Sequence, residues 1–118
     1  MPIHYTVCQE ADKLVRGERQ DTYDHPFDNF TRIGKIWGLI LETQDPIPPE
    51  KVALMMCGVK LAREIFKHHR DNTVDLAGYA QALEMVQERK EELSQVKDNS
   101  ISKRDSHSHL SSRKSGDI

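Results

Sequence analysis

Cysteine is scarce in this chain of 118 residues, and the two cysteines present, Cys8 and Cys57, lie far apart. A distant pair does not build the disulfide framework of a small secreted protein, so a reducing, cytoplasmic setting is expected. Long apolar runs are also missing. The longest, residues 52–59, is far shorter than the roughly 20 residues that span a bilayer. No signal-peptide pattern is present, and a soluble protein is predicted.

Strong charge of one sign is absent, as are the common catalytic signatures. The net charge is only −2, so no overall field attracts nucleic acid or an acidic membrane. The sequence contains no glycine-rich phosphate loop, no Cys-x-x-Cys, no His-Glu-x-x-His and no Gly-x-Ser-x-Gly. Nucleophilic catalysis by cysteine or serine therefore has no support.

Apolar residues recur at helical spacing in four stretches, and no stretch alternates as a strand would. Thr6 is the predicted N-cap of the first helix, with Gln9 completing a capping box. A tight loop is predicted at residues 19–26. The third helix is apolar on every side over its first half, which is typical of a central helix. The fold is predicted to be all-α and four-helix bundle-like, with helices at residues 6–19, 27–42, 49–67 and 71–95.

The end of the sequence differs in composition from the rest. Residues 97–118 are rich in serine, lysine, arginine and histidine and contain few apolar residues. Such a segment cannot bury a core of its own, so a disordered tail is predicted after a single domain at residues 1–96. His107 and His109 are two apart within this tail and are interpreted as incidental.

Two carboxylates mark the run from His69 to Tyr79. Asp71 and Asp75 are four apart, which places them on one helix face, one turn apart. Mg²⁺ favours one or two carboxylates, with phosphate oxygens and water completing its shell. Glu64 precedes this pair across a short turn. The same spacing is equally typical of Asp71 as a helix cap and Asp75 in an ion pair.

Cations and an aromatic loop lie near these acids in the sequence. Lys60 and Arg63 share one helix side and would suit a phosphate, or form an ordinary solvated face. His25, followed by Pro26, could act as a general base, contact phosphate or serve structure. Tyr23 could stack on a base or pack in the core.

Three motifs carry a resemblance to a known family over residues 6–87. They are Arg19…Thr22-Tyr23-x-His25-Pro26-x-x-Asn29-Phe30, Val52-Ala53-Leu54-Met55-Met56…Lys60-x-x-Arg63 and His69-x-Asp71-Asn72-x-x-Asp75-x-Ala77-Gly78-Tyr79-Ala80. Together they resemble small phage and prophage proteins of unknown function, also described as MazG-like. A fainter similarity extends to the all-α MazG-type nucleoside triphosphate pyrophosphatases. Those enzymes hold Mg²⁺ with acids in an ExxE…ExxD arrangement, whereas this chain has Lys60-x-x-Arg63 and Asp71-x-x-x-Asp75. A second departure is Asp24, which follows the loop tyrosine at a position where the family that this chain resembles tends to have glycine.

The resemblance implies a nucleotide pyrophosphohydrolase that acts with Mg²⁺ and forms a homo-oligomer. Its implied metal ligands are Asp71, Asp75 and Glu64, and its implied catalytic residue is His25. The implied substrate-binding residues are Tyr23, His25, Lys60, Arg63, Asn72 and Tyr79. Two alternatives remain open: a non-catalytic protein that binds or sequesters a nucleotide, for instance against a host defence, and a structural or protein-interaction helical bundle.

Overall fold

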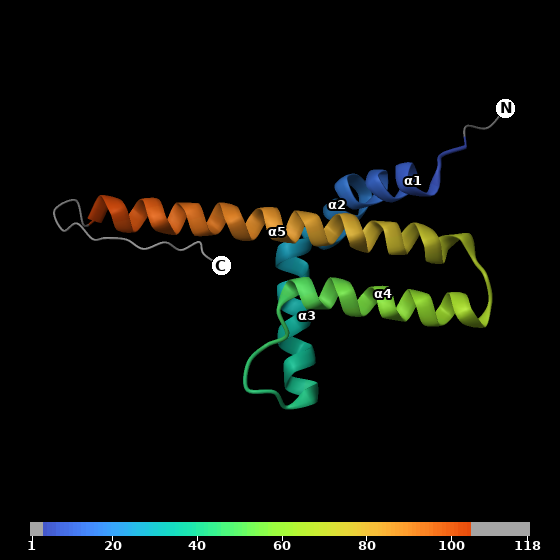
Figure 1. The fold of residues 1–118 in the computed structure, drawn as a ribbon, viewed down its shortest axis with the longest axis horizontal. Helices are drawn as coiled ribbons and strands as arrows, with labels where there is room; N and C mark the ends of the chain where they lie inside the picture. Colours follow the sequence, from blue (N-terminus) through green and yellow to red (C-terminus); the bar gives the residue numbers. More distant parts are fainter. Residues whose placement is uncertain (1–3, 105–118) are drawn as a thin grey trace.

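The computed structural model describes residues 4–104, and side chains over residues 4–100. Over that range the chain is helical, with four helical segments and no strand (Figure 1). The predicted all-α fold is confirmed. The first segment is continuous but changes its hydrogen-bonding pattern, and consists of α1 (Val7–Lys13), a π-helix (Leu14–Glu18) and α2 (Arg19–Tyr23). The remaining segments are α3 (Pro26–Leu41), α4 (Pro49–Phe66) and α5 (Arg70–Arg104).

Helix α5 is the axis of the structure. A short turn joins α4 to α5, so the two helices lie antiparallel along the first half of α5 (Figure 1). The first segment packs along another side of α5. Helix α3 crosses the direction of α4 and α5 and contacts both. The C-terminal part of α5 extends past the other helices (Figure 1). The closest packing is therefore confined to the first half of α5.

Two helix starts follow the sequence signals. The Thr6 hydroxyl accepts from the Gln9 N–H at 3.1 Å, and the Gln9 side chain accepts from the Thr6 N–H at 2.9 Å. This is the predicted capping box. Pro26 occupies the first position of α3, where its missing N–H costs nothing.

The loop predicted at residues 19–26 was wrong. Arg19 continues the helix, because its N–H donates to the Leu14 carbonyl five residues earlier in a π-type bond. Residues 19–23 form α2, and the chain leaves the helix only at Asp24 and His25. The segment is polar because nearly all of its residues are exposed, and polarity alone resembled a loop.

Helix α5 is longer than predicted. It continues to Arg104, past the expected end near Gln95. Glu, Lys, Gln and Arg are good helix formers and form i,i+3 and i,i+4 pairs without a core. Neither α5 nor any other helix within residues 4–104 is both long and apolar enough to cross a membrane. Residues 105–118 of the predicted tail, with His107 and His109, lie outside the described residues.

The core lies where α3, α4 and α5 meet. Its buried members are Phe30, Val52, Ala53, Ala82 and Val86, and the half-buried Trp37 packs against them. Only one side of α4 joins this core. Its other side is exposed, so the prediction of a central helix was wrong for a single chain.

The connector between α3 and α4 crosses α3 at a glycine. Ile47 donates its N–H to the Gly34 carbonyl at 3.1 Å. A Cβ at position 34 would lie 1.9 Å from the Ile47 carbonyl oxygen. Only glycine permits this approach, which places Ile47 against the core and sets where α4 begins.

Candidate functional site

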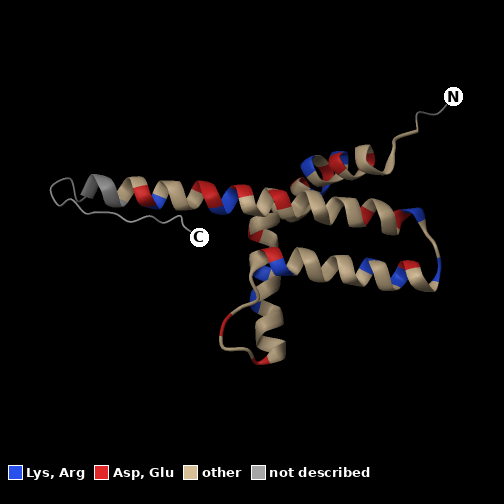
Figure 2. Cartoon of the chain, in the orientation of Figure 1, with Lys and Arg blue, Asp and Glu red and all other residues tan. Residues whose placement is uncertain are grey.

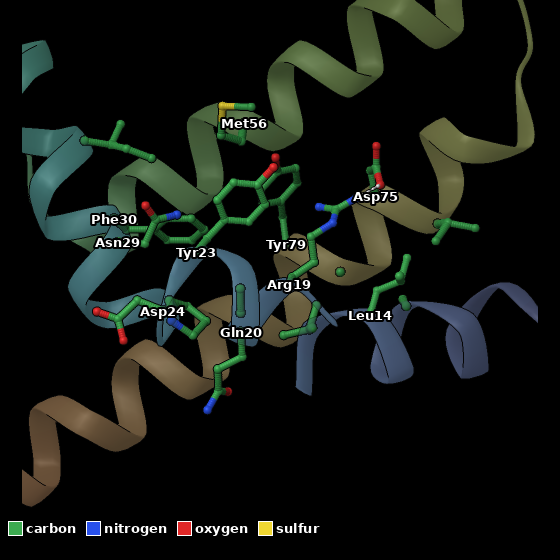
Figure 3. A pocket seen from close by; sticks show the side chains of 17 residues that line it. Leu14, Arg19, Gln20, Tyr23, Asp24, Asn29, Phe30, Met56, Asp75 and Tyr79 are labelled. Atoms are coloured by element: carbon green, nitrogen blue, oxygen red, sulfur yellow. Dashed lines mark ion pairs between the residues drawn. The ribbon is translucent and has the colours of Figure 1, made fainter. Parts of the chain in front are cut away.

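A cavity of about 400 Å³ lies between the first helical segment, α3, α4 and α5 (Figure 3). This volume falls within the range of small-molecule sites, roughly 300–1,000 Å³. Much of the wall is apolar and aromatic, and a few polar groups converge on it. The aromatic and sulfur-containing lining residues are Tyr23, Phe30, Met56 and Tyr79, and the polar ones are Arg19, Gln20, Asp24, Asn29 and Asp75.

The π-helix sets which face of the first segment borders the cavity. Ala11, Val15, Arg19 and Tyr23 all line it, and they are spaced four apart. In a regular α-helix such a row drifts around the axis, because a turn has 3.6 residues. The wider π turn at Leu14–Glu18 compensates part of that drift. Arg19 and Tyr23 are thereby kept on the same face as Val15.

Asp75 supplies one of the two acidic groups that line the cavity and is held by two cations. Lys60 Nζ lies 2.9 Å from one carboxylate oxygen, and Arg19 Nη2 lies 3.6 Å from the other. The Asp75 and Lys60 side chains are only 17% and 13% exposed, whereas Arg19 is 47% exposed. Lys60 is therefore the fixed partner of Asp75, and Arg19 is the cation that a ligand in the cavity can reach (Figure 3).

Two tyrosines present hydroxyl-bearing rings to the same space (Figure 3). Tyr79 packs beside Phe30, with ring centroids 6.2 Å apart and planes inclined by 38°. Burial, followed by the nearby Asp75 charge, raises the pKa of Tyr79, so its hydroxyl stays protonated at neutral pH. Tyr23 is 54% exposed. Flat surfaces of this kind suit a planar ring in a ligand.

Asp24 ends α2 in a backbone conformation that favours glycine, with φ 80° and ψ 175°. Its carboxylate accepts from the His25 N–H at 2.8 Å. This hydrogen bond, with help from Arg32, lowers the pKa of Asp24. The family resemblance implied glycine at this position, and the observed φ and ψ give the physical reason.

Replacing Asp24 by glycine is expected to give a more stable protein than replacing it by alanine, by about 1–3 kcal/mol. Both changes remove the carboxylate, but only glycine also removes the strain of the positive φ. Urea unfolding of the two variants measures the difference. Equal stability of the two variants would show that the backbone at position 24 is unstrained.

His25 acts at the start of α3. Its Nδ1 accepts from the Phe27 N–H at 3.0 Å, which makes His25 the N-cap. Burial, followed by the positive charge of Arg89, lowers the pKa of His25. A neutral ring with a free Nδ1 lone pair is the form that this cap requires. His25 does not line the cavity described above, and its catalytic role stays a prediction.

Glu64 and Asn72 join the end of α4 to the start of α5. Glu64 accepts from the Asn72 side chain at 2.9 Å and from the His69 N–H at 3.1 Å, and it also pairs with His68. These bonds, with Asn72 the largest contributor, lower the pKa of Glu64 to about 2. Asn72 is buried, so this cluster fixes the turn between the two helices.

Asp71 and Arg63 are both exposed. Helix α5 begins at Arg70, so Asp71 lies inside the first turn and is not the N-cap that one interpretation made it. An acid in the first turn still complements the helix dipole.

The three carboxylates proposed for Mg²⁺ do not fit one site in a single chain. Asp75 faces two cations, and Glu64 accepts hydrogen bonds from the turn. No group of three or more His, Cys, Asp or Glu in the described part of the chain could hold a metal ion.

The structure brings together only part of the predicted site. Tyr23, Asp75 and Tyr79 line the cavity, and Lys60 adjoins it through Asp75. Arg19, Gln20, Asn29 and Met56 also line it, although none was predicted as a site residue. Two signals could have found Arg19: it opens the family motif that continues to Tyr23, and it lies on the four-residue row that runs from Ala11 through Val15 to Tyr23.

Comparisons with known proteins agree with the expected extent of the family. A family model described as a domain of unknown function, DUF6378, matches residues 6–87. The chain is 35% identical over 83 residues to the Gene 55 protein of Mycobacterium phage L5, and 37% identical over 84 residues to the Gene 55 protein of Mycobacterium phage D29. Each match covers 70% of this chain and 53% or 54% of the relative, so the chain spans about half the length of these relatives. No solved structure matches the chain.

Proposed function

We propose that this chain, which belongs to the DUF6378 family of unknown function and has relatives in phages, binds a nucleotide in the cavity between its helices. The observation that carries the proposal is the convergence of Tyr23, Tyr79 and Arg19 on one space of ligand size. An aromatic ring and an accessible guanidinium are the two groups that a base and a phosphate need.

The cavity wall has an apolar part that suits the base of a nucleotide and a cationic part that suits its phosphate. Phe30, Met56 and the tyrosines form the apolar part, where a base would stack. Arg19 has a long contact to Asp75, at 3.6 Å, and nearly half of its side chain is exposed. Its guanidinium is therefore free to turn toward a phosphate, while Lys60 keeps Asp75 neutralised.

Binding without turnover is the form of this proposal that the geometry supports best. Hydrolysis of the kind seen in MazG-type pyrophosphatases needs acids that converge on a metal and its substrate. Asp75 and Glu64 are instead held by other side chains, and Asp71 is exposed. The MazG-like relationship is retained only as the reason to expect a phosphate-bearing ligand. The expected homo-oligomer is likewise a proposal, supported by exposed apolar side chains on α3 and α4.

Calorimetric titration with nucleoside mono-, di- and triphosphates tests the proposal. Removal of Arg19 by Arg19→Ala is expected to weaken binding by about tenfold to a hundredfold, the effect of a lost charge-assisted hydrogen bond. Arg16→Ala is the matched control. Arg16 lies on the same helical segment, pairs with Asp12 at 2.8 Å and does not line the cavity, so its removal should leave the affinity unchanged.

A pyrophosphate-release assay on the same panel, with Mg²⁺ present, separates binding from turnover. Binding without release supports the proposal as stated, and release would replace it by the hydrolase alternative. Absence of binding to every nucleotide, or equal affinities for Arg19→Ala and Arg16→Ala, would contradict it.

A further inference from the structure

Helix α4 exposes an apolar face on the side away from the core. This outer face consists of Leu54, Met55, Gly58, Val59, Leu61, Ala62, Ile65 and Phe66. Its C-terminal end is the most exposed, since Ile65 and Phe66 are 86% and 90% exposed, whereas Leu54 at the other end is 55% exposed. The charged residues of the same stretch, Lys60, Arg63 and Glu64, are not part of this face. A helix that is apolar on both sides is normally covered on both sides.

The order of residues along the outer face is the same from either end. Large residues come first at positions 54 and 55, a small one follows at 58, and 59 and 61 flank the centre. A small residue then stands at 62 and large ones at 65 and 66. The residue numbers of two corresponding positions always add up to 120. Leu54 thus corresponds to Phe66, Met55 to Ile65 and Gly58 to Ala62.

Such a pattern is self-complementary in one arrangement. When two copies of α4 pack antiparallel about a two-fold axis, residue i of one copy lies opposite the corresponding residue of the other. Every apolar side chain of the outer face then meets an apolar partner.

Close approach at the centre of the face is also possible. A Cβ built on Gly58 meets nothing within 4 Å, and Ala62 one turn later is small and exposed. Small residues in this position let two helix backbones come near each other, while the larger residues at both ends interlock.

The outer part of α3 supports the same occupant. Leu39, Ile40 and Leu41 near its C-terminus are 80%, 71% and 58% exposed. This end of α3 projects past α4 near the N-terminus of α4 (Figure 1), and Figure 2 shows few charged residues along it. In an antiparallel pair, the C-terminal end of α4 from the second copy lies beside the N-terminus of α4 and the C-terminal end of α3. One occupant therefore covers both apolar surfaces.

We propose that the outer face of α4 is the interface of a two-fold symmetric dimer, with the two α4 helices antiparallel and centred between Gly58 and Ala62. This surface is separate from the cavity wall, so the dimer does not depend on the proposed nucleotide binding.

Sedimentation equilibrium of the full chain tests the dimer. Wild-type protein is expected at about twice the chain mass of 13.6 kDa. Ile65→Glu is expected to weaken association by about a hundredfold or more, because it would place a carboxylate in an apolar interface. Its helical circular dichroism should be unchanged, since Ile65 is exposed within the chain. The control is Leu93→Glu, which alters an exposed apolar residue three positions past Lys90, the ion-pair partner of Glu50 in the first turn of α4, and should stay dimeric.

Cross-linking tests the antiparallel register. In a Cys8→Ser/Cys57→Ser background, Leu54→Cys/Phe66→Cys is expected to form covalent dimers with a short thiol cross-linker. Leu54→Cys alone should not. In this register its two copies are separated by about 18 Å, which is 12 residues at 1.5 Å per residue. A monomeric wild type, a dimer that survives Ile65→Glu, or efficient cross-linking by Leu54→Cys alone would each overturn the proposal.

Discussion

Replacing Gly34 by alanine is expected to lower the free energy of unfolding by about 3 kcal/mol, the upper part of the range for overpacked sites. The added Cβ would lie 1.9 Å from the Ile47 carbonyl oxygen, far inside van der Waals contact. That oxygen belongs to the backbone and cannot rotate away. The connector must therefore move as a whole, and the Ile47 N–H to Gly34 carbonyl bond is lost with it. Urea unfolding followed by circular dichroism measures the change.

Gly17→Ala is the control for this prediction. Gly17 also lies in a helix, but nothing stands within 4 Å of a Cβ built there. Alanine at this position should be neutral or stabilising by about 0.5–1 kcal/mol, since it restricts the unfolded chain. If Gly34→Ala proved no more destabilising than Gly17→Ala, the close crossing of α3 by the connector would be incorrect.

Removing the carboxylate of Asp75 by Asp75→Ala is expected to cost about 3 kcal/mol of stability. The Lys60 side chain is only 13% exposed and would lose its carboxylate partner in a largely buried position. The double variant Lys60→Met/Asp75→Ala should recover much of the loss, because it removes the unpaired charge. Comparing Asp75→Ala and Lys60→Met, each alone, with the double variant gives the coupling free energy of the Lys60–Asp75 pair.

Asp12→Ala provides the comparison for an exposed pair. Asp12 and Arg16 are both more than half exposed, and removing such a pair costs less than about 1 kcal/mol. A loss at Asp75 as small as that at Asp12 would mean that Lys60 is solvated without its carboxylate.

Much of the fold could be predicted because its signals are local. The Thr6 capping box, the proline at the start of α3 and the apolar periodicity of four stretches depend on residues within a turn or two. The extent of the first segment could not be predicted in the same way. A π turn has no strong sequence signature, and an exposed polar helix looks like a loop when only hydrophobicity is considered.

The site could be predicted only in part, because a motif names residues without giving their partners. The run from Asp71 to Tyr79 does contribute Asp75 and Tyr79 to the cavity. Asn72 from the same run turns away to bind Glu64 across the turn between α4 and α5. Spacing along one helix places side chains on a face, but which face meets which neighbour depends on packing between helices. Arg19 was missed for this reason.

The π-helix at Leu14–Glu18 accommodates one residue more than a regular α turn would hold. Deleting one residue there would let the segment close into a regular α-helix. The helix after the turn would change its direction of facing only slightly, so Arg19 and Tyr23 would stay on the side of Asp75 and Tyr79. A deletion between Arg19 and Tyr23, where the helix is already regular, would instead turn Tyr23 by about 100° around the helix axis. When relatives of this chain are aligned, a one-residue gap within residues 14–18 is therefore compatible with the same cavity, whereas a gap just after it is not.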